Sequence, residues 1–356
     1  MKKFKTFDIT FFVFLFSFLV LLYLSVTFFP QVLVTYLQIN LQSKDLDLLS
    51  NSIGNIVGTL VAMLAAFLTF IAFWVQYTAN KQQWHSIQID RLENRIFELL
   101  NLHKQNTNEL QIRAYSGNEV VIISGRNIFP FLFDEFRNIY SLLSNFDSFQ
   151  SKKNIVQIAY TIYFIGIKDE NKDYLTKLLS LYCTQTETAE LIKYFRDLQE
   201  TESYNVVAPQ ENVEFIPKIF YVRYNGYQSE LGHYYRNLFQ SIKFIDEYQP
   251  HLLSDLDKYN YTKSIRAQLS NYEQLLLYYN TLTSFGKPWL QKNKDGNYLD
   301  SYLIKYKMIK NLPLPLADFG IKPEELFKKE IDFLGNKKPS EALFELQEII
   351  NSSVNI

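Results

Sequence analysis

The chain has 356 residues and a formal net charge of −1, and aromatic side chains make up 16% of it. This near-neutral balance argues against a protein that works mainly by nonspecific nucleic-acid binding. Glycine and proline are few, 11 and 10 residues, which favours long helices over turn-rich sheets.

Two uninterrupted apolar runs near the N-terminus predict membrane-spanning helices. Residues 9–29 and 53–75 contain no charged side chain. Each run reaches the roughly 20 residues that a helix needs to cross a hydrocarbon core about 30 Å thick. A signal peptide is the competing interpretation of the first run, but the run is long and no small-residue cleavage site follows it. We therefore expect residues 1–80 to form a membrane anchor of two transmembrane helices in contact with lipid.

Basic residues flank these two runs unequally. The connecting segment, residues 30–52, carries Lys44 against two aspartates. The outer flanks are more basic, and positive charge near a membrane favours the cytoplasmic side. We expect both termini to be cytoplasmic, because the basic residues lie before the first run and after the second: Lys2, Lys3, Lys5, Lys81, Arg91 and Arg95.

Small residues recur every four positions in the second apolar run, at Gly54, Gly58, Ala62 and Ala66. Such a face lets two helices approach closely in lipid, within the hairpin or between copies of the chain. The alternative is that glycine and alanine are simply common in membrane helices, and both interpretations stay open.

A helix is expected next, over residues 82–104. Its apolar positions alternate spacings of three and four, which is a short coiled-coil pattern. The pattern is too short to specify a coiled coil strongly, so packing against the chain's own body is the preferred interpretation. A homo-oligomer through this stalk or through the membrane helices is the other. The seam consists of Ile89, Leu92, Ile96, Leu99 and His103.

The remaining chain predicts a mainly helical body. Apolar residues on both sides of Ser116-Gly117-Asn118 are compatible with a small β-hairpin over residues 109–124. Residues 201–226, with two prolines, indicate a connecting segment. Helical patterns cover residues 127–143, 154–165, 172–181, 187–199, 228–248, 256–285, 298–311, 324–333 and 340–350.

We therefore expect a mainly α fold, with two N-terminal transmembrane helices followed by a helical cytoplasmic domain. The domain would cover residues 81–312 and include the small hairpin. Residues 313–356 would form a helical C-terminal tail.

Strong catalytic motifs are absent from the sequence. It contains no phosphate-binding loop, no HExxH zinc motif and no GxSxG nucleophile elbow, and its four histidines are scattered. The single cysteine, Cys183, excludes an intrachain disulfide and a cysteine-based zinc site, and fits a small apolar residue better than a nucleophile. We expect no metal or cofactor, and a protein that is not an enzyme.

Two helices nevertheless carry polar stripes. If residues 256–285 form one helix, four polar residues share one side of it, and the preceding helix offers His233 and Arg236. Solvent-exposed faces are the ordinary explanation for such stripes. The functional interpretation is a mixed polar pocket between the two helices, in which an arginine binds an anion. That pocket would contain His233, Arg236, Arg266, Ser270, Glu273 and Asn280.

Several segments together resemble a known family, the phage abortive infection proteins of bacteria, which include the lactococcal AbiC protein. The resemblance covers residues 50–312. The segments are Phe73-Trp74-Val75-Gln76-Tyr77, Phe97 through His103, Gly125-Arg126 with Phe129, Gly232 through Leu238, Arg266 through Asn280, Lys305-Tyr306 and Asn311-Leu312.

The resemblance implies antiviral defence in a bacterium, where an infected cell stops growing or dies before phage progeny emerge. It places the chain in the inner membrane, with the cytoplasmic body sensing a phage-derived or host trigger. It transfers no catalytic residues. Two alternatives stay open, a membrane-tethered nuclease or nucleotide-handling enzyme and a non-enzymatic membrane scaffold.

Overall fold

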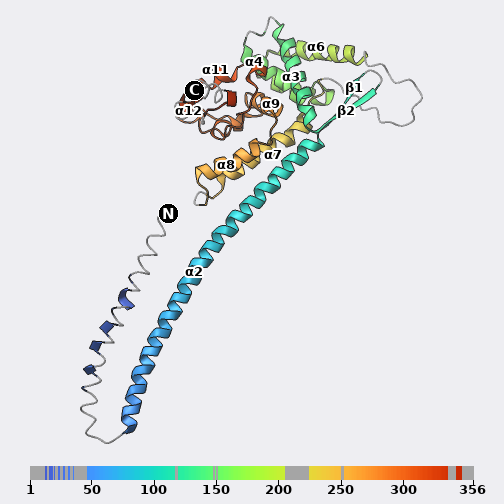
Figure 1. The fold of residues 1–356 in the computed structure, drawn as a ribbon. Coiled ribbons are helices and arrows are strands. Elements are labelled where there is room, and N and C mark those ends of the chain that lie inside the picture. Colours follow the sequence, from blue (N-terminus) through green and yellow to red (C-terminus); the bar gives the residue numbers. More distant parts are fainter. Residues whose placement is uncertain are drawn as a thin grey trace, which may run out of the picture. The chain divides into compact units, whose positions relative to one another are not determined.

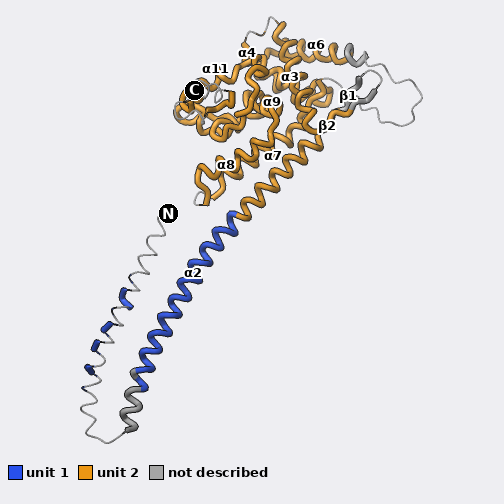
Figure 2. The backbone as a smooth tube through the Cα atoms, in the orientation of Figure 1, with its two compact units in different colours: residues 1–89 blue, residues 90–356 orange. Residues whose placement is uncertain are grey.

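The computed structural model describes residues 46–116, 119–146, 149, 151–204, 224–249, 252–335 and 342–346. It also describes positions 13, 16–18, 20, 23–24, 27–28, 31–32 and 35. The chain divides into two units, residues 1–89 and 90–356 (Figure 2). We describe each unit by itself.

The first unit is dominated by the N-terminal part of one helix, α2, which runs from Leu46 to Glu109 without a break (Figure 1). Among the described residues, this is the one helix long and apolar enough to cross a membrane, and none of its apolar window is buried. Large side chains such as Val61, Leu68 and Phe73 are 59–67% exposed. By length and composition this part of α2 could cross a membrane, and its large apolar side chains are exposed.

The first expected membrane helix, residues 9–29, lies largely outside the described residues. Of the two predicted transmembrane helices, only the second is matched by a helix long and apolar enough among the described residues, so the prediction of two is not confirmed. Within the first unit, the ring of Phe18 stacks on that of Phe67 in α2, with 4.0 Å between centroids and 7° between planes. This contact joins the first apolar run to the second.

In the second unit, the C-terminal part of α2 packs against the chain's own body. Leu92, Ile96 and His103 from the predicted seam are buried. The hydroxyl of Tyr261, in α8, donates a hydrogen bond of 3.0 Å to Glu93. These seam residues therefore pack against other helices of the same chain, and the structure shows no coiled coil among its described residues.

The predicted hairpin is confirmed. Strands β1 (Gln111–Ser116) and β2 (Glu119–Ser124) pair antiparallel, with Gln111 opposite Ser124. Its strands carry the β-branched residues that favour pleated structure, and the short helix η1 (Gly125–Asn127) follows at once.

Helices build the rest of the second unit around an aromatic core. The ring of Phe136 lies 5.0–5.6 Å from those of Tyr160, Tyr163, Tyr279 and Phe319, so α3, α4, α9 and the C-terminal part meet there (Figure 1). The first helices are α3 (Ile128–Ser144), α4 (Lys152–Ile165), η2 (Asp169–Asn171), α5 (Lys172–Leu179) and α6 (Gln185–Tyr204). The later ones are α7 (Gln228–Glu247), α8 (Asp255–Arg266), α9 (Asn271–Thr281), η3 (Lys287–Trp289), α10 (Tyr302–Lys305), η4 (Leu314–Leu316), α11 (Pro323–Leu326) and α12 (Lys328–Gly335).

Backbone hydrogen bonds attach the segment before α7 to the C-terminal end of α4. Tyr227 donates its backbone N–H to Phe164 over 3.0 Å, and Ile167 donates to Tyr224 over 2.9 Å. Gly166 and Gly226 have φ of 78° and 86°, and a Cβ added to Gly166 would lie 2.2 Å from the carbonyl oxygen of Asn225. Glycine is required at these two positions, because a side chain would separate the two backbones.

The expected single helix over residues 256–285 is wrong. Helix α8 ends at Arg266, and α9 begins after Ser270, whose extended backbone and side chain start a new helix. The Ser270 hydroxyl accepts from the N–H of Glu273, and the Glu273 carboxylate accepts from the N–H of Ser270. This reciprocal capping box stabilises a helix start in the middle of an apolar pattern.

The C-terminal expectations are also modified. The helix expected at 298–311 is reduced to α10, because Lys307 adopts a left-handed φ of 49°. The helix expected at 324–333 is divided into α11 and α12. Most of the expected helix at 340–350 and of the connecting segment at 201–226 lies outside the described residues.

Candidate functional site

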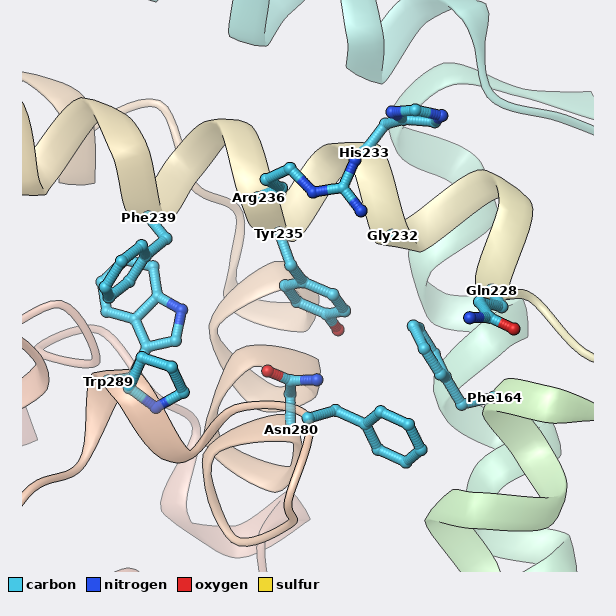
Figure 3. A pocket seen from close by; sticks show the side chains of 11 residues that line it. Phe164, Gln228, Gly232, His233, Tyr235, Arg236, Phe239, Asn280 and Trp289 are labelled. Atoms are coloured by element: carbon cyan, nitrogen blue, oxygen red, sulfur yellow. The ribbon is translucent and has the colours of Figure 1, made fainter. Parts of the chain in front are cut away.

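A cavity of about 390 Å³ opens beside α7 in the second unit (Figure 3). Helix α7 contributes Gln228, Gly232, Tyr235, Arg236 and Phe239 from one face, and His233 lies at the margin of that face. The end of α4, the end of α9 and the segment around η3 complete the wall. The lining residues are Phe164, Gln228, Gly232, His233, Tyr235, Arg236, Phe239, Asn280, Phe285, Pro288 and Trp289.

Aromatic rings form two pairs in the wall. Phe239 meets Trp289 edge to face, with centroids 5.3 Å apart, and Phe164 meets Phe285 at 4.8 Å. In Figure 3, Tyr235 points from α7 toward Asn280, with Phe164 on one side and the Phe239–Trp289 pair on the other. The wall therefore presents flat apolar surfaces on two sides of a polar centre.

The polar centre is formed by Tyr235 and Asn280. The Asn280 amide nitrogen donates to the hydroxyl of Tyr160 over 2.9 Å, which fixes the orientation of the amide. The Tyr235 hydroxyl is buried and has no hydrogen-bond partner of good geometry in the described part of the chain. Burial raises the pKa of Tyr235 well above its ordinary value, so this hydroxyl is neutral. The neighbouring Tyr160 hydroxyl interacts with it, so Tyr160, Tyr235 and Asn280 form one polar group behind the wall.

Two basic side chains, His233 and Arg236, belong to the exposed part of the wall. Neither forms an ion pair or hydrogen bond with another described residue, and no aspartate or glutamate is among the lining residues. An arginine without a carboxylate partner can bind a planar or tetrahedral anion with two parallel hydrogen bonds. The cavity therefore favours a negatively charged group at this edge.

Gly286, which lies between the lining residues Phe285 and Pro288, approaches α9 closely. A Cβ on Gly286 would lie 2.3 Å from the carbonyl oxygen of Asn280 and 2.4 Å from its side-chain oxygen. By contrast, a Cβ on Gly232 would meet no heavy atom within 4 Å. The first glycine is needed for packing, and the second leaves open space.

A second polar group, which we call the Glu273 cluster, lies elsewhere in the second unit. It comprises the buried residues Glu273, Tyr234 and His103, the half-buried Ser270 and the exposed Arg126. The Glu273 carboxylate accepts from the Tyr234 hydroxyl over 2.9 Å and from the Ser270 N–H over 2.6 Å. His103 Nε2 and Arg126 Nε each lie 4.0 Å from a carboxylate oxygen. The cluster ties α2, η1, α7 and α9 together.

His103 is the unusual member of this cluster. Its side chain is 4% exposed, and neither ring nitrogen forms a hydrogen bond within the described residues. Burial lowers the pKa of His103 below 6.5, the Glu273 carboxylate acts in the opposite direction, and Arg126 adds to the lowering. At neutral pH the imidazole is therefore uncharged.

The residues expected in one polar pocket are divided among three places. His233, Arg236 and Asn280 line the cavity. Ser270 and Glu273 belong to the Glu273 cluster. Arg266 is 6% exposed and donates through Nη1 to the carbonyl oxygens of Tyr306 and Lys307, both over 3.2 Å, so it holds the C-terminal segment. The helix break at Ser270 separates Arg266 from Ser270 and Glu273, and two helical turns along α9 separate Glu273 from Asn280.

The sequence analysis did not predict the other cavity residues, because most of them are aromatic and resemble ordinary core residues. Tyr235 sits between His233 and Arg236 in the sequence, and Trp289 follows the Gly286-Lys287-Pro288 helix stop. The Ser270-x-x-Glu273 spacing is a capping-box signature that would have revealed the helix break. His103 was visible as a polar residue in an apolar seam.

The other candidate residues lie outside these sites. An added Cβ at Gly54 or Gly58 meets nothing within 4 Å, and Ala62 and Ala66 are exposed. Cys183 is half-buried, and burial raises the pKa of its thiol to about 11, with a contribution from Glu187. Within the described residues, no three His, Cys, Asp or Glu side chains group as they would around a metal ion.

Comparison with known proteins identifies part of this unit. Residues 226–316 match the family model described as "Putative phage abortive infection protein". The match begins just before α7 and ends at η4, so it includes every cavity residue except Phe164. No curated protein and no solved structure matches the chain significantly. The resemblance expected from the sequence is confirmed over this stretch.

Proposed function

We propose that the protein is a membrane-anchored bacterial antiphage protein that acts by abortive infection. The observation that carries this proposal is the family match over residues 226–316. In this role the cytoplasmic body senses infection, and its response stops growth or kills the infected cell before phage progeny emerge.

The membrane part of the proposal rests on unit 1. The apolar window of α2 is unburied, and the Phe18–Phe67 contact joins it to the first apolar run. A two-helix hairpin in the inner membrane, with both termini in the cytoplasm, accounts for these facts and for the basic flanks.

The sensing part of the proposal rests on the cavity. The matched segment builds nearly all of the wall, and the wall carries two unpaired basic side chains beside the polar group of Tyr235 and Asn280. A preformed space with a few convergent polar groups is typical of a small-molecule site.

An enzymatic function is less well supported. A general base must reach a substrate, but the Glu273 side chain is completely buried, and both its oxygens accept hydrogen bonds within the chain. These contacts support a structural role for Glu273.

The test is phage plating on a bacterial host that carries the intact gene, with a host carrying an early stop codon as the control. We expect at least a tenfold lower plating efficiency for a sensitive phage. At low phage dose the culture survives, and at high dose it collapses, because each infected cell is lost. Unchanged plating across a broad phage panel contradicts the proposal. Protection with survival of infected cells at high dose contradicts abortive infection.

A further inference from the structure

We propose that the α7 cavity binds a nucleoside monophosphate, with the base between the aromatic pairs and the phosphate at Arg236 and His233. This deepens the proposed function and rests on it for the biological meaning of binding. The ligand class itself follows from the chemistry of the wall.

The aromatic pairs select a flat ring. Phe164 lies on one side of the polar centre, and Phe239 and Trp289 lie on the other (Figure 3). The ring of Phe285 lies 4.8 Å from that of Phe164. Trp289 is 2% exposed, so its indole is held by packing and is not free to collapse into the space. Aromatic side chains stack on bases with about 1–3 kcal/mol per base.

The polar centre selects a ring with hydrogen-bonding atoms over a hydrocarbon. The Tyr235 hydroxyl, which is buried and interacts with the Tyr160 hydroxyl, points toward Asn280 in the middle of the wall. The amide of Gln228 lies at another edge of the same cavity. A purely apolar ligand would cover the exposed Gln228 amide without hydrogen bonds, at a cost of about 1–3 kcal/mol, whereas a base edge would satisfy this amide.

The charge of the wall selects an anionic substituent. Arg236 and His233 are the charged or titratable side chains of the lining apart from Tyr235, and both are exposed. Because no carboxylate neutralises Arg236 here, its guanidinium can bind a phosphate bidentately. A volume of about 390 Å³ is near the lower end of small-molecule sites, roughly 300–1,000 Å³, which favours one nucleotide over a dinucleotide or a strand.

The experiment measures binding to the full chain, purified in detergent micelles, by isothermal titration calorimetry. The probes are AMP, GMP, CMP and UMP. Adenosine and ribose 5-phosphate serve as controls that lack the phosphate or the base. We expect at least one monophosphate to bind with a Kd below 1 mM (about −4 kcal/mol), and its two parts to bind at least tenfold more weakly.

Three variants locate the site. Gly232→Leu fills the open space beside Gly232, and we expect it to abolish binding. Arg236→Met removes the phosphate partner at an exposed position, and we expect at least a tenfold weaker affinity. Lys243→Met makes the same change in charge on the same helix outside the cavity, where Lys243 pairs with Glu247 at 3.7 Å, and should bind as the unaltered chain does.

Three outcomes overturn the inference. No monophosphate binds at 5 mM, adenosine binds as tightly as AMP, or Gly232→Leu and Arg236→Met both bind normally. These outcomes are separate from failure of the proposed function. A chain that binds AMP but gives no phage protection refutes the antiphage role alone, and a protective chain that binds none of the probes refutes the ligand class alone.

Discussion

The Glu273 cluster shows how single residues decide the interior of the second unit. A buried carboxylate is tolerated because Tyr234 and Ser270 donate to it and Arg126 lies 4.0 Å away. His103 beside it is left without hydrogen bonds. The cluster therefore combines a well-satisfied acid with an imidazole that burial keeps neutral.

This imidazole should make stability depend on pH. Because the pKa of His103 is lowered in the folded chain, the unfolded chain takes up a proton below about pH 6.5 that the folded chain does not. Stability is therefore lost as pH falls from about 6.5 toward the folded pKa. His103→Leu removes this loss. We expect its thermal unfolding midpoint, relative to the unaltered chain, to stay nearly constant from pH 7.5 to about 6.5 and to rise as the pH falls further toward 5.

The control for this prediction is Thr107→Val, one turn further along α2. Thr107 is 3% exposed and donates to the backbone carbonyl of His103, but it does not titrate. Its effect on the midpoint should stay constant over the same pH range. If the two variants follow the same pH profile, His103 does not contribute to acid sensitivity.

At the scale of elements, the amphipathic helices were predictable and their interruptions were not. Helices α3 to α7 lie within a few residues of the expected ranges, because each has one apolar face. The pattern through residues 256–285 stays apolar across the break, so periodicity alone could not reveal it. The break depends on side-chain hydrogen bonds at Ser270, and these changed the placement of Arg266 and Glu273.

Two glycines on neighbouring elements should respond oppositely to the same substitution. Gly286→Ala places a methyl group against Asn280, and overpacking of this kind costs about 1–3 kcal/mol. Gly232→Ala adds a methyl group to open space in a helix interior, where it should stabilise by about 0.5–1 kcal/mol. Thermal unfolding of the full chain in detergent measures both changes.

The two variants, Gly286→Ala and Gly232→Ala, serve as controls for each other, because both add one methyl group to a glycine. A stable Gly286→Ala variant would mean that the segment before η3 moves freely relative to α9. In that case the cavity wall would not be preformed.

At the scale of the molecule, the division into an apolar N-terminal unit and a helical body was predictable. The two apolar runs near the N-terminus contain no charged side chain, whereas charged residues recur throughout the rest of the chain. The position of the cavity was not, because it depends on aromatic residues brought together from α4, α7 and the segment after α9. Those residues resemble ordinary core residues in the sequence.

The small-residue face of α2 allows a test of association. Gly54 and Gly58 have no neighbours within 4 Å of an added Cβ, and Ala62 is exposed, so a single chain does not use this face in its described part. Leucine is favourable in lipid. We expect Gly58→Leu combined with Ala62→Leu to leave phage protection unchanged in the plating assay, provided that the protein level is equal. Loss of protection at equal level would show that copies pack through this face.

The mutual approach of Gly166 and Gly226 has a consequence for how such chains can diverge. Backbone contacts at Phe164 and Tyr224 attach α7 directly to the end of α4. Related chains that keep this contact should therefore keep glycine at both positions, because a side chain at either one would separate the two backbones.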